Sequence, residues 1–420
     1  MKKLILISLF LAATAAYTRI PKGLDGGSNR CYFNATLQSL CNIEQLSDYF
    51  INNTGIVNKS INLYKDNDNK NKIVSSKTIV TEFATALSRM RKATKSITIS
   101  NKFYRNIQDN FIFPKLRRTD IRAYDKQRDA TGFTSGLLAT LGNNVKSCTA
   151  YQPPGYTGVD GPCNIVPGKL FAFSEIYTKI AAEDKTGDKA YKKDDILSIK
   201  NDYSDKLSLP IPKQNKPNRL TELLNNYHQE PNETDFTISY RSDGNPIYIK
   251  AKTFITLQST PEILQLMFKR QIYAKDGTIT KDNAKISFPQ ELDLSDFPLT
   301  DKNTIGNRNY QLIAIIAQSG SITGGHYIAY TRDVTQTNKN KQWYKCDDSI
   351  ITQLNNKKAQ KVFAGEHEGD FTPYLLFYQR QDSFNEASQM AGEIPDISKD
   401  LTKLNAQLAI IKNAIDQQGS

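Results

Sequence analysis

The sequence has 420 residues, of which 39% are hydrophobic and 23% are charged. A chain of this length and composition can bury at least one large core, which excludes a wholly disordered protein and a membrane protein with many spans. The net charge is +12, but lysine is mixed with asparagine and aspartate, as in residues 65–72, and long basic runs are absent. We therefore expect a solvated basic surface and no nucleic-acid partner.

The N-terminus has the pattern of a secretory signal peptide. Lys2 and Lys3 precede an apolar stretch from Leu4 to Ala13, which is followed by small residues suited to cleavage. We expect residues 1–16 to be a signal peptide and the protein to be secreted, with delivery to a host cell or retention in the periplasm as destinations. A buried N-terminal element and an uncleaved anchor are the alternatives. No stable membrane insertion is expected after cleavage, because the apolar stretch is short.

Apolar spacing predicts helices in the first 145 residues and strands later. Helical patterns start near Cys31 and cover residues 79–90 and 133–141. A loop rich in Pro and Gly follows at 153–167. The predicted strands are Lys206–Ile211, Phe236–Tyr240, Ile247–Ile255, Ile263–Phe268, Lys285–Phe288, Tyr310–Ala317, His326–Arg332, Gln342–Lys345 and Tyr374–Tyr378. Helices followed by strands predict an α+β fold.

Residues 381–420 form a segment of a different kind. Between residues 397 and 415, apolar residues recur at alternating spacings of four and three, which is a heptad seam. Such a helix needs a partner. Self-association through residues 397–415, docking on the rest of the chain and a marginally stable tail are the three possibilities.

The cysteines and histidines offer a thiol nucleophile and a base. Cys31 stands at the start of a predicted helix, where the N–H groups and the helix dipole favour a thiolate; a buried structural cysteine is the alternative. Of three histidines, His228 and His367 fall in polar runs that suggest loops, whereas His326 opens a predicted strand. Asp347 follows the next predicted strand and could return to orient His326, giving a Cys–His–Asp arrangement.

These residues carry a resemblance to the ubiquitin-specific proteases. Residues 23–38, which contain Cys31, resemble the cysteine box of that family, and residues 324–330 with 343–349 resemble its histidine box. Residues 127–133 resemble the segment that opens a leucine-rich helix. Further matches follow in the family's order at residues 207–211, 260–270, 288–294 and 374–378, so that the resemblance extends over residues 20–380.

The resemblance implies a papain-like α+β domain over residues 17–380, with a helical thumb, a β palm and β fingers without zinc. It also implies hydrolysis of the bond after the C-terminal glycine of ubiquitin, with ubiquitin and its conjugates as partners. Cys31 would be the nucleophile, His326 the base and then the acid, and Asp347 the orienting carboxylate, with Asp348 as the neighbouring alternative. The residues expected to bind the ubiquitin tail are Asp129, Gly324, Gly325 and Tyr327.

The sequence departs from the family pattern at several positions. Gly26 stands where the family has an asparagine that donates to the oxyanion, and the Asn29 side chain or backbone N–H groups could replace it. No Cys-x-x-Cys pair occurs, so neither a zinc site nor another metal or cofactor is expected. Cys148 and Cys163 bracket the Pro- and Gly-rich loop and could form a disulfide after export, or remain free thiols.

The function that follows is an exported thiol-dependent deubiquitinase. The expected source is a bacterium with an AT-rich genome, whose substrates would be host conjugates, and a eukaryotic secretory protein is the alternative. Two alternatives belong to other classes: a ubiquitin-binding protein whose site is weakened by Gly26, and a thiol hydrolase for another ubiquitin-like modifier or for ordinary peptides.

Overall fold

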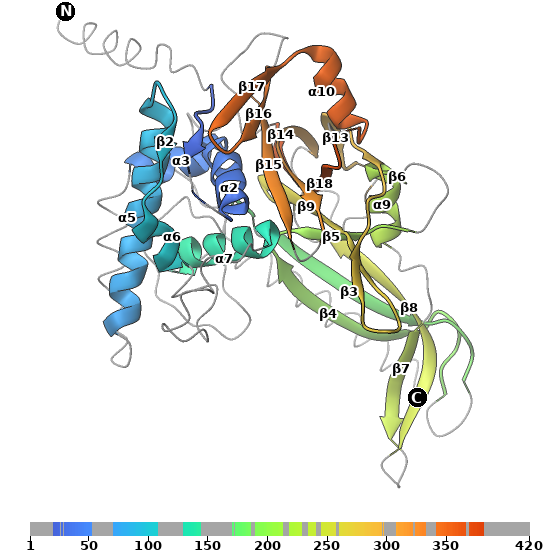
Figure 1. The fold of residues 1–420 in the computed structure, drawn as a ribbon. Helices are drawn as coiled ribbons and strands as arrows, with labels where there is room; N and C mark the ends of the chain where they lie inside the picture. Colours follow the sequence, from blue (N-terminus) through green and yellow to red (C-terminus); the bar gives the residue numbers. More distant parts are fainter. Residues whose placement is uncertain are drawn as a thin grey trace, which may run out of the picture. The chain divides into compact units, whose positions relative to one another are not determined.

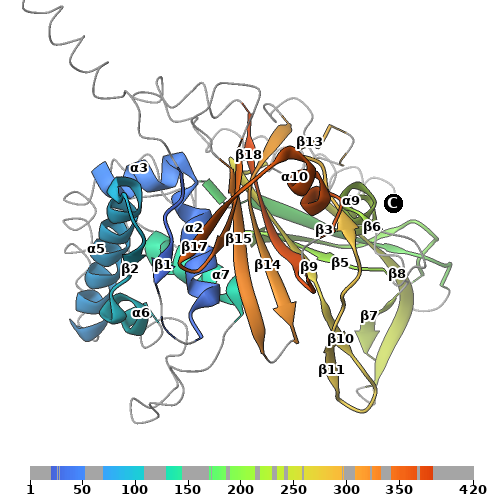
Figure 2. The same ribbon diagram turned by 45° about the horizontal axis from the view of Figure 1, so that its top comes forward.

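The computed structural model describes most of the chain between residues 20 and 381 (Figures 1 and 2). The described residues are 20–25, 27, 29–52, 70–107, 129–143, 170–171, 173–185, 190–212, 218–228, 234–240, 245–257, 260–295, 297, 308–321, 324–332, 342–366 and 369–381. The chain divides into two compact units, residues 1–381 and 382–420. The predicted signal peptide, the heptad segment, Gly26, Cys148, Cys163 and His367 lie outside the described residues. No helix in the described part is long and apolar enough to cross a membrane.

Helices dominate the N-terminal part of the first unit. The described helices there are α2 (Cys31–Cys41), α3 (Glu44–Asn52), α5 (Lys70–Lys92), α6 (Asn101–Ile107) and α7 (Ala130–Asn143), with the parallel strands β1 (Leu24–Asp25) and β2 (Ile97–Thr98). The three helices predicted from apolar spacing are present as α2, α5 and α7. On α5, Phe83 and Leu87 are fully buried, as their spacing of four residues requires for one helix face.

Helix α2 is buried on every side rather than along one stripe. Its polar side chains are paired, because a buried polar group without a partner is costly. The Thr36 and Thr134 hydroxyls lie 3.1 Å apart, which joins α2 to α7. Past the end of the helix, the Asn42 amide donates to the Ile313 carbonyl at 2.8 Å, which joins α2 to the large sheet. Helix α2 is therefore tied to both α7 and the large sheet.

The large sheet has eight strands in the order β17–β16–β15–β14–β18–β9–β5, with β13 also paired to β14. Its strands are β5 (Leu207–Pro210), β9 (Ile263–Lys269), β13 (Glu291–Asp293), β14 (Asn309–Gly320), β15 (Gly325–Arg332), β16 (Trp343–Asp347), β17 (Ile350–Leu354) and β18 (Thr372–Arg380). Side chains of β14 enter two different cores, and a register shift between Leu312 and Ala314 interrupts their strict alternation. Ile313 and Ile316 pack with the helices, whereas Leu312 and Ile315 pack on the other face.

A second antiparallel sheet has the order β4–β3–β8–β7. Its strands are β3 (Phe173–Ala181), β4 (Ile196–Ser204), β7 (Thr234–Tyr240) and β8 (Pro246–Leu257). The sequence predicted β7 and β8 but not β3 and β4. On β4 the large apolar residues Ile196 and Ile199 are exposed, so this strand has no alternating pattern from which it could be predicted.

The remaining elements are short: β6 (Asn218–Arg219), α9 (Leu220–His228), β10 (Gln271–Tyr273), β11 (Ile279–Lys281), β12 (Ile286–Ser287) and α10 (Asn356–Phe363). The expectation of a loop at His228 is wrong, because this residue ends α9 and its Nδ1 lies 2.7 Å from the Ile255 carbonyl oxygen. The predicted α+β class is confirmed by the architecture of helices followed by two sheets.

Candidate active site

Cys31 is the first residue of α2, as the sequence predicted, and it is buried. The preceding Arg30 occupies the N-cap position, but its side chain makes no capping hydrogen bond. Its guanidinium instead lies 4.3 Å from the centre of the Tyr104 ring. The sulfur atom therefore sits at a helix N-terminus whose dipole favours negative charge.

His326 and Asp347 meet because they lie on adjacent antiparallel strands. His326 is near the start of β15 and Asp347 ends β16, and the two strands pair from Ala329–Cys346 to Arg332–Trp343. The His326 Nε2 lies 2.6 Å from the Asp347 Oδ1. Because Nε2 faces the carboxylate, Nδ1 is the ring nitrogen left for the Cys31 side chain, to which His326 is also hydrogen bonded. The structure thus brings all three predicted catalytic residues together.

The electrostatics of the group favour a protonated imidazole. The hydrogen bond with Cys31 raises the pKa of His326 to about 9; burial opposes this rise, and the hydrogen bond with Asp347 adds to it. Burial alone would raise the pKa of Asp347, but its hydrogen bond with His326 and the nearby charges lower that pKa below its ordinary value. A neighbouring imidazolium is the arrangement that stabilises a nucleophilic thiolate.

Two residues that were not predicted from the sequence, Lys345 and Phe371, contact the pair formed by His326 and Asp347, which we call the dyad. The Lys345 Nζ lies 3.3 Å from the Asp347 Oδ2, on the opposite carboxylate oxygen from His326. The Phe371 ring packs edge-on against His326, with centroids 6.0 Å apart, and the Lys345 Nζ is 5.5 Å from the centre of the same ring. Lys345 could have been found, because it lies two residues before Asp347 and so shares its side of the strand. Phe371 gave no signal in the sequence.

Asp348 has a different role from its neighbour. Its Oδ1 accepts a hydrogen bond of 2.8 Å from the Asn34 amide, and its backbone carbonyl accepts one of 2.8 Å from the Leu24 N–H. Asp348 adopts a left-handed backbone with φ of 49°, which turns its side chain from β16 toward α2. Of the two candidate carboxylates, Asp347 therefore pairs with His326, and Asp348 ties the β16–β17 turn to α2.

The turn before His326 needs glycine for steric reasons. A Cβ added to Gly325 would lie 1.9 Å from the Ser319 carbonyl oxygen, so no side chain fits there. The turn is closed by a hydrogen bond of 2.7 Å from the Ser321 N–H to the Gly324 carbonyl, and the Gly320 N–H donates to the Asp370 carboxylate at 2.9 Å. Backbone without side chains therefore borders His326 on this side.

A sequence profile of the family described as ubiquitin carboxyl-terminal hydrolase matches residues 22–378, which is most of the chain. The chain belongs to this family. The resemblance noted in the sequence is thus confirmed. The cysteine box places Cys31 at the start of α2, and the histidine box places His326 on β15 and Asp347 on β16.

Individual members of the ubiquitin carboxyl-terminal hydrolase family match shorter parts of the chain. Ubiquitin carboxyl-terminal hydrolase 10 of Mus musculus is 36% identical over 133 residues, which are 30% of this chain and 16% of that protein. The Drosophila melanogaster hydrolase named nonstop is 31% identical over 134 residues, which are 32% of this chain and 24% of that protein. The chain thus spans less than a quarter of the length of these curated relatives.

A solved structure shares the fold. It is the SAGA Ubp8/Sgf11/Sus1/Sgf73 DUB module bound to ubiquitin aldehyde, to which this structure is similar with a TM-score of 0.60 and 18% identity, covering 90% of this chain and 75% of that chain. At 18% identity, this similarity shows that the two chains share a fold.

Asp129 and Tyr327, two of the residues predicted to bind the ubiquitin tail, are in contact with each other. The Asp129 Oδ2 caps α7 by accepting from the Gly132 N–H at 2.7 Å and from the Thr131 hydroxyl at 2.5 Å. The Tyr327 hydroxyl donates to Asp129 Oδ1 at 3.5 Å. Burial and the Asp129 charge raise the pKa of Tyr327 well above its ordinary value, so its hydroxyl stays a donor. Asp129 itself is exposed and can meet a basic peptide.

The predicted oxyanion residues are placed only in part. Asn29 has a left-handed backbone with φ of 60°, which turns the chain immediately before the N-cap of α2. Gly26 lies outside the described residues. Its reading as the substitute for the family's asparagine stays a prediction.

One group of side chains within the described ranges has donor atoms close enough for a cation: His326, Asp347 and Asp348, whose donor atoms lie within 4.8 Å of one another. These atoms already have partners. Asp347 Oδ1 faces His326 and Asp348 Oδ1 accepts from Asn34. We therefore interpret His326 and Asp347 as the acid–base pair of the site and Asp348 as a contact to α2, rather than the three residues as a metal centre.

Proposed function

We propose that the protein is a thiol hydrolase that cleaves peptide and isopeptide bonds after the C-terminal glycine of ubiquitin. The observation that carries this proposal is the chain of hydrogen bonds from Cys31 through His326 to Asp347, in a member of the ubiquitin carboxyl-terminal hydrolase family. The combination of a thiol, a base and a group that orients the base is the arrangement needed for nucleophilic catalysis of acyl transfer.

The reaction follows from the geometry in two steps. His326 takes the proton of the Cys31 thiol, and the sulfur attacks the carbonyl carbon of the terminal glycine. The tetrahedral intermediate collapses to a thioester when His326 returns the proton to the leaving amine. A water molecule, deprotonated by the same imidazole, then attacks the thioester and releases the carboxylate, while the sulfur regains its proton. Asp347 keeps the imidazole oriented and stabilises its charged form throughout.

The oxyanion of the intermediate requires donors near the sulfur. The N–H groups at the start of α2 are suitable, because Arg30 does not cap them with its side chain. Asn29, which directly precedes Arg30, is the side-chain candidate.

The substrate preference is supported by the surroundings of His326. A Cβ at Gly325 would meet the Ser319 carbonyl oxygen, so Gly324 and Gly325 give the turn before His326 a backbone without side chains, which suits a narrow tail that ends in two glycines. The exposed Asp129 carboxylate suits the basic residues that precede these glycines. The net charge of +12 makes such a local acidic group useful, because a basic peptide would otherwise be repelled.

Hydrolysis of ubiquitin carrying a C-terminal fluorogenic amide tests the proposal. We expect turnover by the wild-type protein, none by Cys31→Ala, and ubiquitin binding by both. Binding of ubiquitin without turnover by the wild type would favour the alternative of a ubiquitin-binding protein. We consider this alternative because Gly26 stands where the family has the asparagine that donates to the oxyanion. Turnover of another ubiquitin-like modifier, with ubiquitin inert, would favour the second alternative.

We also propose that the protein is exported, and that a bacterial source would make it an effector acting on host conjugates. This proposal rests on the charged and apolar pattern of residues 1–16 and on the scarcity of ubiquitin in bacteria. Fusion of residues 1–25 to a reporter tests it: export with cleavage near Ala16 is expected, and retention of an uncleaved reporter in the cytoplasm would contradict it.

A further inference from the structure

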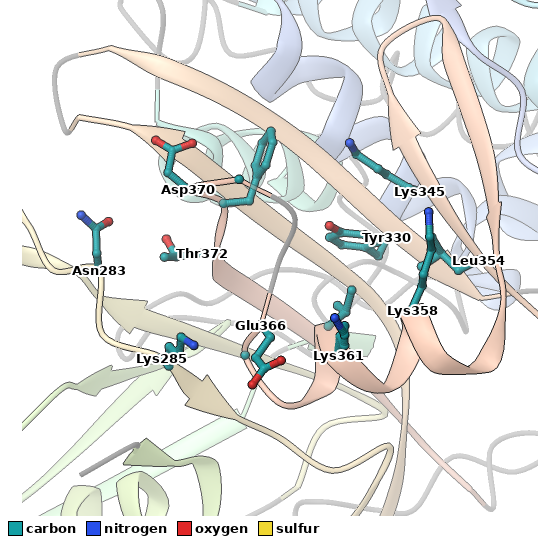
Figure 3. A pocket seen from close by; sticks show the side chains of 14 residues that line it. Asn283, Lys285, Tyr330, Lys345, Leu354, Lys358, Lys361, Glu366, Asp370 and Thr372 are labelled. Carbon is teal, nitrogen blue, oxygen red and sulfur yellow. The ribbon is translucent and has the colours of Figure 1, made fainter.

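A cavity of about 610 Å³ lies near His326 and Asp347, because two of its lining residues, Phe371 and Lys345, contact them. Figure 3 shows the side chains that line this cavity. Its walls come from β15, β16, β17, helix α10 and the segments around residues 283–285 and 365–372. A volume of this size falls in the range of small-molecule sites and is many times that of one water molecule. None of the catalytic residues lines it, so it is a separate feature of the molecule.

The cavity is lined by more positive than negative side chains. Four lysines contribute to it, from three different parts of the fold: Lys285, Lys345, Lys358 and Lys361. In Figure 3, Lys345, Lys358 and Lys361 follow one side, and Lys285 with Asn283 lies across from them. Only two carboxylates, Glu366 and Asp370, line the same space. Asp370 is engaged with the Gly320 N–H.

This arrangement favours a ligand with several negative charges. Ammonium groups that face one cavity repel one another, and an anion that bridges them turns this repulsion into attraction. Lysine is a good phosphate ligand because its compact charge has three donors. The Asn283 amide adds a polar group to the same walls, whereas the Thr372 hydroxyl donates to the Gln318 carbonyl at 3.2 Å. A single phosphate would leave most of the volume empty, so the fitting ligand carries more than one.

Lys345 connects the cavity to the catalytic site. Its side chain lines the cavity, while its Nζ lies 3.3 Å from the Asp347 Oδ2. Phe371, which also lines the cavity, packs against His326. An anion near Lys345 would draw part of its charge away from Asp347. The Asp347 carboxylate would then act more strongly on His326.

We propose that this cavity binds a small polyanion with several phosphate groups, and that the bound anion enhances the reactivity of Cys31 through Lys345, Asp347 and His326. The binding half of this inference is independent of the proposed function. Both halves can be measured without ubiquitin, so their failure is distinguishable from a failure of the deubiquitinase proposal.

Calorimetric titration of the full chain with tripolyphosphate and with inositol hexakisphosphate, in 150 mM salt, tests the binding. We expect saturable binding with one site, weakened about tenfold by Lys361→Ala, as removal of one charge-assisted contact predicts. The matched control is Lys357→Ala, which removes the same charge from the same helix but from a residue that does not line the cavity. Equal weakening by both variants, or no binding by the wild type, would overturn the proposal.

A second experiment distinguishes a lipid headgroup from a soluble metabolite as the ligand that carries the phosphate groups. Phosphatidylcholine vesicles with 5% phosphatidylinositol bisphosphate are sedimented with the wild type and with Lys361→Ala. Binding to both soluble compounds and vesicles, lost in the variant, assigns the site to a lipid headgroup. Binding to the soluble compounds alone assigns it to a free metabolite. Vesicle binding that Lys361→Ala leaves unchanged contradicts the use of this cavity for lipid.

The rate of Cys31 alkylation by iodoacetamide, a neutral reagent, tests the coupling. Saturating tripolyphosphate should raise this rate about twofold or more over potassium chloride of equal ionic strength, because a better stabilised imidazolium increases the thiolate fraction. Cys31→Ala gives the background from other thiols. Lys345→Met should remove the response to the anion. An unchanged rate in the wild type at full occupancy, or a full response in Lys345→Met, would overturn the coupling.

Discussion

Replacing Asp347 with asparagine isolates the charge that the structure places against His326. The two side chains make a hydrogen bond of 2.6 Å, and they are 28% and 37% exposed. A hydrogen bond to a charged group contributes about 1.5–3 kcal/mol, and partial exposure to solvent puts this one at the lower end. Because one pKa unit corresponds to about 1.4 kcal/mol, the pKa of His326 should fall by about one unit in Asp347→Asn.

The pH dependence of kcat/KM for a ubiquitin amide measures this shift. The leaving amine needs the proton of the imidazolium, so activity is lost as the pH rises through the pKa of His326. Since that pKa is raised to about 9, the wild type should keep its activity up to about pH 9. Asp347→Asn should lose it near pH 8, and its rate at neutral pH should fall about tenfold or more, because the imidazole is also less well oriented.

Asp348→Asn is the matched control for this prediction. Asp348 pairs with Asn34 and not with His326, so its replacement should leave the alkaline limb where it is and lower the melting temperature instead. A shift of the limb in Asp348→Asn, with none in Asp347→Asn, would refute the assignment of the two carboxylates.

Two further predictions concern single glycines, and a third concerns metal. Gly325→Ala should destabilise the protein by about 1–3 kcal/mol in thermal unfolding and lower its activity, because the new Cβ would meet the Ser319 carbonyl oxygen. In the control Gly132→Ala, on α7, the free energy of unfolding should stay within about 0.5 kcal/mol of the wild-type value. Gly26→Asn should raise the single-turnover rate if the oxyanion lacks a side-chain donor; a neutral or harmful effect together with a strongly damaging Asn29→Ala would assign that role to Asn29 instead. A chelator should change neither the melting temperature nor the activity, since strands β3, β4, β7 and β8 contain no cysteine, and stoichiometric zinc in elemental analysis would contradict this.

The sequence predicted best what is local and periodic. Cys31 could be placed at a helix start, and His326 on a strand, because apolar spacing and the preceding glycines mark both elements. The pairing of His326 with Asp347 could be anticipated because neighbouring strands in a sheet often pair in chain order.

The interactions that decide between similar residues could not be predicted. Asp347 and Asp348 are chemically equal in the sequence, and only the left-handed backbone at Asp348 and the position of Asn34 separate their roles. Phe371 reaches His326 from a segment 45 residues further along the chain. His228 was expected in a loop because its neighbours are polar, yet contacts with β8 hold it at the end of α9. In each case a contact distant in sequence determines the outcome.

The central claim is that Cys31, activated by His326, attacks the C-terminal carbonyl of ubiquitin. Incubation of the full chain with ubiquitin bearing a C-terminal electrophile, followed by peptide mapping, tests it most directly. The account predicts one covalent adduct, at Cys31, which is lost in Cys31→Ala and forms much more slowly in His326→Ala without weaker ubiquitin binding. An adduct at Cys41 or Cys346, or labelling that survives Cys31→Ala, would contradict it.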